Sequence, residues 1–154
     1  MINHEKIKYK IVELEKPKNS RRGRIKINGR EPELHERKTL ECLSDYGFDV
    51  ETIIPSNVPG SRNPDILMMG TFWEMKAPRT TDRETIATRF RKAIKQSSGK
   101  VIFDLRNIDG KMRMEEVKEI IMGLFLSTRG MRRIMVIEIT DNGEEKILDI
   151  SKRK

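Results

Sequence analysis

The hydrophobic and polar positions of the chain follow two periods, one typical of helices and one typical of strands. Apolar side chains recur at helical spacing in three segments, which are residues 31–46, 82–97 and 114–126. Alternating or short continuous apolar runs predict six strands, at residues 48–54, 65–69, 71–75, 101–105, 134–139 and 146–150. Asp141-Asn142-Gly143 predicts a tight hairpin turn between the last two strands. The resulting order of helix, three strands, helix, strand, helix and hairpin predicts a three-layer α/β domain.

Residues 1–30 are less regular than the rest of the chain. Residues 6–14 alternate as a strand would, but a basic loop that contains Pro17 and Gly23 follows, and then only a short apolar run at residues 25–27. We therefore expect residues 1–30 to form a basic N-terminal extension or hairpin, and residues 31–154 to form the folded domain.

Length and composition exclude several classes of protein. The 154 residues are enough for one domain with a substantial core, and no apolar run approaches the roughly 20 residues that a membrane span needs. The first residues lack the apolar stretch of a secretory signal, and the single cysteine, Cys42, excludes an intramolecular disulfide. We expect no membrane partner and a cytoplasmic site of action, and delivery into another cell stays open.

The net charge of +8 is distributed in blocks. Residues 1–30 carry a net charge of +7, residues 31–75 of −6, residues 76–100 of +6 and residues 101–154 of +1. Basic blocks attract polyanions such as nucleic acids, whereas the acidic block gathers carboxylates in the middle of the chain. Charge alone fits a nucleic-acid-binding surface and an ordinary solvated surface equally well.

Three polar side chains in the acidic block form a candidate catalytic group. Side chains alternate along a strand, so Glu74 and Lys76 project from the same face. If a tight turn folds the strands of residues 65–69 and 71–75 together, Asp65 lies opposite the end of the second strand, near Lys76. Carboxylates suit Mg²⁺ or a similar divalent cation, which activates water for phosphodiester hydrolysis, and a lysine beside them can orient that water.

The tripeptide pattern alone is weak evidence for such a site. An acidic residue two positions before a lysine occurs five times in the chain. Only the Glu74 copy lies in an apolar strand that follows a Pro-Asp strand start. A hairpin whose polar face is merely solvated is the structural alternative.

The Pro64-Asp65 and Glu74-x-Lys76 motifs resemble the signature of the PD-(D/E)XK nuclease superfamily. About residues 34–150 are similar to the C-terminal nuclease domains of contact-dependent growth-inhibition toxins. Three further segments carry this similarity, namely His35-Glu36-Arg37, Asp45-Tyr46-Gly47 and Lys95-Gln96. The resemblance implies an α/β fold with a restriction-endonuclease-like αβββαβ core. Its central mixed sheet would be flanked by helices and followed by a C-terminal helix and hairpin.

The same resemblance implies roles for five residues. Asp65 and Glu74 would bind the cation, and Glu36 from the first helix would join them as a third metal ligand. Lys76 would orient the attacking water, and Gln96 would support the site. The cation would be Mg²⁺, Mn²⁺ or another divalent ion.

Other polar and aromatic residues have less specific interpretations. His4 and His35 lack the spacing of metal ligands, and His35 is expected to face a different direction from its helix neighbour Glu36. Trp73 is expected in the core, with base stacking as a secondary role. Four basic side chains are candidate phosphate contacts, namely Arg62, Arg79, Arg89 and Lys92.

Together these features favour a metal-dependent endonuclease, which would be a toxin or a mobile-element nuclease. RNA resembling transfer RNA is slightly favoured over DNA, because several members of the similar toxin group cleave transfer RNA. The alternatives are a non-catalytic basic nucleic-acid-binding module and an interaction domain with no nucleic-acid role. The resemblance also implies an acidic immunity or inhibitor protein as a partner, and the oligomeric state stays undecided.

Overall fold

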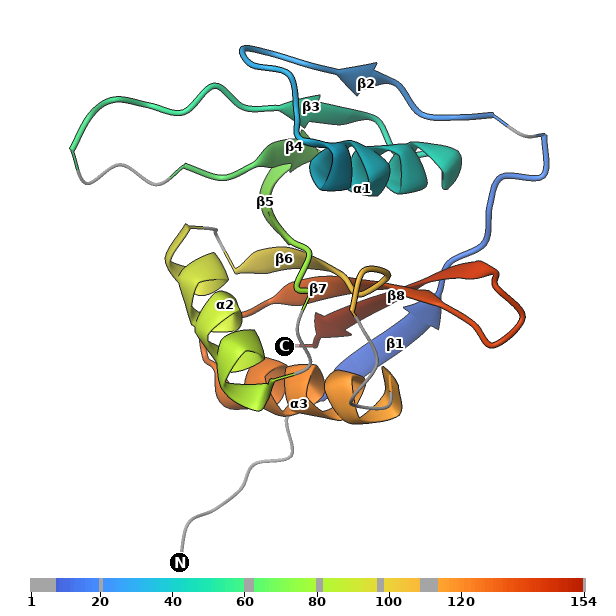
Figure 1. The fold of residues 1–154 in the computed structure, drawn as a ribbon, viewed down its shortest axis with the longest axis vertical. Helices are drawn as coiled ribbons and strands as arrows, with labels where there is room; N and C mark the ends of the chain where they lie inside the picture. Colours follow the sequence, from blue (N-terminus) through green and yellow to red (C-terminus); the bar gives the residue numbers. More distant parts are fainter. Residues whose placement is uncertain are drawn as a thin grey trace, which may run out of the picture.

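The computed structural model describes residues 8–19, 21–59, 63–79, 82–96, 99–108 and 114–153. Over these residues the chain forms three helices and one mixed sheet of eight strands (Figure 1). The helices are α1 (Leu34–Asp45), α2 (Arg83–Gln96) and α3 (Met114–Ser127). The strands are β1 (Tyr9–Glu13), β2 (Ile25–Lys26), β3 (Val50–Thr52), β4 (Ile66–Met68), β5 (Thr71–Lys76), β6 (Lys100–Asp104), β7 (Arg133–Ile139) and β8 (Glu145–Lys152). None of the described helices is long and apolar enough to cross a membrane.

The predicted order of helices and strands is confirmed from α1 to β8. The strands lie in the order β1-β8-β7-β6-β5-β4-β3-β2. Neighbours are parallel at β2–β3, β5–β6 and β6–β7 and antiparallel at the other four pairings, so the sheet is mixed. The predicted turn between β7 and β8 is also present, with Gly143 at a φ of 79°. The α/β class predicted from the sequence is therefore confirmed.

Two hydrophobic clusters lie on opposite faces of the sheet, which gives the predicted three layers. On β6, Val101 and Phe103 pack with α2 and α3, whereas Ile102 packs on the α1 side. The α1 cluster also buries Trp73, and the α2–α3 cluster stacks Phe90 on Phe103 with ring centroids 5.6 Å apart. The middle of the sheet is thus held between two packed layers.

The described part of residues 1–30 does not form a hairpin, which corrects that alternative for this segment. β1 pairs with β8 at one edge of the sheet, and β2 pairs with β3 at the opposite edge. Near β2 the backbone runs against the end of α1, where a Cβ on Gly23 would lie 1.8 Å from the carbonyl oxygen of Phe48. An alternating sequence pattern indicates a strand but not its partner, so the sequence did not reveal that the segment spans the whole sheet.

β4 and β5 form the predicted hairpin, and β5 then changes partner. Met69 and Gly70 have φ values of 53° and 72°, as a type I′ turn requires. Residues 71–73 pair with β4, whereas residues 74–76 pair with β6. The sheet therefore forks between Trp73 and Glu74, and in Figure 1 β5 runs from the β2–β3–β4 part to the β6–β7–β8–β1 part.

Candidate active site

A pocket of about 320 Å³ lies at this fork of the sheet. Residues from β5, from the loop before β4, from the start of α1 and from α2 line it. They are Arg30, Glu33, His35, Glu36, Thr39, Asp65, Glu74, Met75, Lys76, Ala77 and Arg89. Four of the five predicted catalytic residues are among them, so the fold brings Glu36, Asp65, Glu74 and Lys76 to one pocket.

Asp65 is held in place by hydrogen bonds to β5. Its backbone N–H donates to the carbonyl oxygen of Trp73 at 3.1 Å, and its Oδ2 accepts a hydrogen bond from the N–H of Met75 at 2.7 Å. If β4 were longer, a backbone carbonyl oxygen would accept the hydrogen bond from the Met75 N–H; here the Asp65 carboxylate accepts it instead. The Asp65 carboxyl group lies close enough to that of Glu74 to interact with it directly, so two carboxylates from neighbouring strands meet here.

Glu74 and Lys76 form a buried ion pair on the wall of the pocket. Glu74 Oε1 lies 3.2 Å from Lys76 Nζ, and the two side chains are 3% and 17% exposed. The second oxygen, Glu74 Oε2, is buried and has no N–H or hydroxyl donor among the described residues. A buried carboxylate oxygen without a donor is costly, and a bound cation would remove that cost.

Burial raises the pKa of Glu74 to about 8. The Asp65 carboxylate contributes to this raised value by repelling the charge of Glu74 and by hydrogen bonding, whereas Lys76 opposes the increase. With its pKa raised in this way, Glu74 keeps a proton over part of the neutral pH range. A divalent cation can replace that proton, because it neutralises the same pair of charges.

Glu36 lies on the α1 side of the pocket and is engaged with the start of its own helix. Its Oε1 accepts a hydrogen bond from the backbone N–H of Glu33 at 3.0 Å, as in a capping box. Among the described residues, the group of candidate ligand atoms that lie within 4.8 Å of one another comes from Glu33, His35 and Glu36. The predicted third metal ligand therefore shares the pocket with Asp65 and Glu74 but does not stand in one tight cluster with them.

Several pocket residues were not indicated by the sequence. Arg30, Glu33 and Thr39 line the pocket without belonging to any motif, and His35 lines it beside Glu36. His35 and Glu36 were predicted to face different directions; both lie in the first turn of α1, and both line the pocket from there. Their position at the start of a helix could have indicated that they lie near one another, since the side chains of a first turn surround the same helix end.

The predicted phosphate contacts are not all at the pocket. Arg89 lines it from α2, whereas Arg79 and Lys92 are exposed and are not among its lining residues. Arg62 lies outside the described residues. Gln96 is the last residue of α2, and its side chain lies outside the part that the structure describes.

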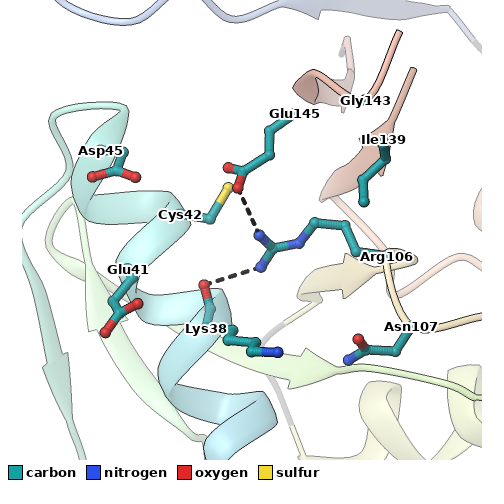
Figure 2. A pocket seen from close by; sticks show the side chains of 9 residues that line it. All are labelled: Lys38, Glu41, Cys42, Asp45, Arg106, Asn107, Ile139, Gly143 and Glu145. Carbon is teal, nitrogen blue, oxygen red and sulfur yellow. Dashed lines mark hydrogen bonds and ion pairs between the residues drawn. The ribbon is translucent and has the colours of Figure 1, made fainter. Parts of the chain in front are cut away.

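A second pocket, of about 460 Å³, lies on another side of α1, and Figure 2 shows that Arg106 reaches across it. Arg106 donates to both carboxylate oxygens of Asp104 at 2.7 and 2.9 Å, to Glu145 Oε1 at 3.1 Å and to the carbonyl oxygen of Lys38 at 3.0 Å. Asp104 is 1% exposed and also accepts a hydrogen bond from the Thr39 hydroxyl at 2.7 Å. This network fixes α1 against the sheet and connects the second pocket to a residue of the first.

Replacing Arg106 by Leu is expected to lower the free energy of unfolding by about 3–5 kcal/mol, because the substitution leaves the Asp104 charge buried without its partner. The matched control is Arg22→Leu, which removes an ion pair with Asp45 from an arginine side chain that is 76% exposed. We expect the control to cost less than about 1 kcal/mol. Urea unfolding followed by circular dichroism measures both values. Equal losses for the two variants would contradict a special contribution from the buried pair.

The fold and the pocket define a class of protein, a mixed α/β domain with a carboxylate–lysine pair and a second carboxylate at a fork of its sheet. The model of the family described as "Contact-dependent growth inhibition CdiA C-terminal domain" matches residues 62–143. The chain therefore belongs to the family of CdiA C-terminal domains, which are toxin domains of contact-dependent growth inhibition. The matched stretch contains Asp65, Glu74 and Lys76, and Glu36 lies before it.

Solved structures add a likeness of fold. The chain is similar to one chain of the "CdiA-CT/CdiI toxin and immunity complex from Burkholderia pseudomallei", with a TM-score of 0.58 and 20% sequence identity. The likeness covers 81% of this chain and 98% of the other. No curated protein sequence matches the chain at a significant level.

Proposed function

We propose that this protein is a metal-dependent endonuclease of the PD-(D/E)XK type that acts as a growth-inhibition toxin. The observation that carries the proposal is the group of Asp65, Glu74 and Lys76, in which two carboxylates and an ammonium share one pocket. The succession of α1, β3, β4, β5, α2 and β6 supports the assignment, because the core order of that superfamily is helix, three strands, helix and strand.

The donors of the pocket fit a hard divalent cation such as Mg²⁺ or Mn²⁺. Asp65 and Glu74 would hold it, since Mg²⁺ is usually bound by one or two carboxylates and retains several waters. The buried and donor-free Glu74 Oε2 is the observation that favours a cation over a simple ion pair with Lys76. Glu36 would join the two through its other carboxylate oxygen, because its Oε1 accepts the hydrogen bond from the Glu33 N–H. When bound, the cation would acidify a water and offset charge on the phosphate.

Lys76 would act on both the carboxylate and the substrate. Its ammonium fixes Glu74 Oε1 at 3.2 Å, and its low exposure keeps the positive charge in a poorly hydrated position. From there it would orient the attacking water and stabilise negative charge that develops on the phosphate. Arg30 and Arg89, which line the same pocket, would neutralise flanking phosphates.

The substrate we favour is RNA, with transfer RNA first and DNA as the alternative. The family includes nucleases that cleave transfer RNA, and the net charge of +8 supports affinity for either polymer without choosing between them. An immunity protein is the second partner we propose, because the similar solved structure is a toxin and immunity complex. The basic surface favours an acidic inhibitor.

The test is a cleavage assay with the purified full chain. Transfer RNA, single-stranded RNA, and linear and supercoiled DNA are incubated with the protein in the presence of Mg²⁺, Mn²⁺ or EDTA. We expect at least one substrate to be cut with either cation and to stay intact in EDTA. Salt-sensitive binding without cleavage in every condition would instead support the non-catalytic binding module, and absence of binding would contradict both functions.

A further inference from the structure

We propose that the exposed ring of Phe72 is a base-stacking subsite for the nucleotide next to the phosphate held in the active-site pocket. The inference rests on the proposed nuclease function, because that function makes the ligand of the pocket a nucleic acid strand. The occupant we assign to the ring is an unpaired nucleobase.

The register of the hairpin places Phe72 next to the carboxylates. Phe72, Glu74 and Lys76 share one face of β5, because side chains two positions apart in a strand point the same way. Phe72 pairs with Leu67 across the hairpin, and Glu74 and Asp65 lie two residues further along from Phe72 and Leu67. Two residues of strand span about 7 Å. A strand whose phosphate lies at the carboxylates can therefore put its adjoining base on the ring.

The same face of the sheet is buried on one side of the fork and exposed on the other. On β6, Val101 is paired with Glu74 and Phe103 with Lys76, and both β6 side chains are fully buried beneath α2 and α3. Phe72, beyond the fork, is 44% exposed. The ring therefore presents apolar surface to solvent two positions along β5 from Glu74, which lines the pocket.

Trp73, the aromatic residue that the sequence suggested for stacking, does not have this role. Its side chain is fully buried in the α1 cluster. Its ring is also accompanied by Lys100 Nζ at 5.9 Å and Arg133 Cζ at 5.6 Å from the centroid. The alternation of β5 thus sends the tryptophan inward and the phenylalanine outward, which the identity of the two residues did not reveal.

The chemistry of a phenylalanine ring defines what it would recognise. The ring has no hydrogen-bonding group, so it stacks on any base and reads no sequence. Stacking needs a base that is splayed out of a helix, as in loops and single strands. The subsite therefore favours unpaired segments of a substrate over continuous duplex.

The experiment measures binding rather than cleavage. A fluorescent single-stranded oligouridylate and a ribose–phosphate oligomer of the same length without bases are titrated with the full chain in the presence of Ca²⁺ in place of Mg²⁺, since Ca²⁺ also binds carboxylate and phosphate oxygens. Anisotropy gives the two dissociation constants. We expect Phe72→Ala to weaken binding of the oligouridylate by about 5- to 150-fold and to leave binding of the abasic oligomer unchanged. Phe72→Tyr should retain wild-type binding, and Ile11→Ala, at a 48% exposed position on β1, should change neither constant.

The outcomes separate the subsite from the nuclease. Equal weakening of both oligomers by Phe72→Ala, or no weakening of either, would overturn the subsite. Loss selective for the oligomer with bases would support it even if no substrate were cleaved in the metal assay. Conversely, the wild type could cleave its substrate while Phe72→Ala causes no selective loss of binding to the oligomer with bases. That result would leave the proposed function standing and refute this subsite.

Discussion

The Asp65→Asn protein is expected to lose metal-dependent cleavage by about 10³-fold while keeping its fold. The amide oxygen of Asn can still accept the hydrogen bond from the Met75 N–H, so the hairpin keeps its register. What disappears is one of the two negative charges that would hold the cation. Metal stabilisation of a phosphoryl transition state is worth several kcal/mol, and this corresponds to about 10³-fold in rate. Initial rates with the best substrate at saturating Mg²⁺ measure the effect.

The control for this variant is Asp141→Asn. It makes the same chemical change at an exposed residue of the β7–β8 turn, outside the pocket, and should cleave at the wild-type rate. Thermal unfolding of both variants shows whether the hairpin is intact. An Asp65→Asn protein that is folded and as active as the control would remove Asp65 from the catalytic group and refute the proposed mechanism.

The candidate pair Glu74 and Lys76 could be predicted from the sequence because the information is local. Strand alternation places two residues at this spacing on the same face. The glycine at position 70 indicates the tight turn that Met69 and Gly70 form. Asp65 follows from the same turn, since the register of a hairpin is set by its loop. Because the three residues lie on one hairpin, their proximity could be predicted without knowing the rest of the fold.

Other parts of the site depend on contacts that are distant in sequence and were not predictable in the same way. Whether Glu36 reaches the carboxylates depends on the cap of α1, where its Oε1 is already bonded to Glu33. The position of α1 depends in turn on Arg106 and Asp104, which the sequence did not single out. β1 and β2 likewise pair at opposite edges of the sheet. These pairings could not be predicted from the sequence, because the remainder of the fold determines which edge strands pair.

In EDTA, Glu74→Gln is expected to become more stable than the wild type as the pH rises from about 5 to 8. The pKa of Glu74 is raised by burial from 4.5 to about 8, so the folded state favours the protonated carboxyl. This contribution to stability is fully present below pH 4.5 and is lost as the pH rises through the folded-state value. The wild type should lose up to about 1.4 kcal/mol for each pH unit in this window. The glutamine side chain does not titrate, and the titrating groups that do not contact residue 74 are common to both proteins and cancel in the difference.

Adding Mg²⁺ at pH 8 should narrow the difference in stability between the two proteins, because a cation bound by the ionised carboxylates stabilises only the wild type. At a Mg²⁺ concentration ten times the dissociation constant, the free energy of unfolding of the wild type rises by about 1.4 kcal/mol. For a chain of this size, that gain raises the melting temperature by about 3–6 °C. Thermal unfolding across pH, with and without the cation, measures both halves of the prediction. A Glu74→Gln protein that gains as much from Mg²⁺ as the wild type would place the cation elsewhere. A wild type whose stability relative to this variant is constant from pH 5 to 8 would show that the carboxyl group is ionised throughout, with Lys76 and not a proton as its partner.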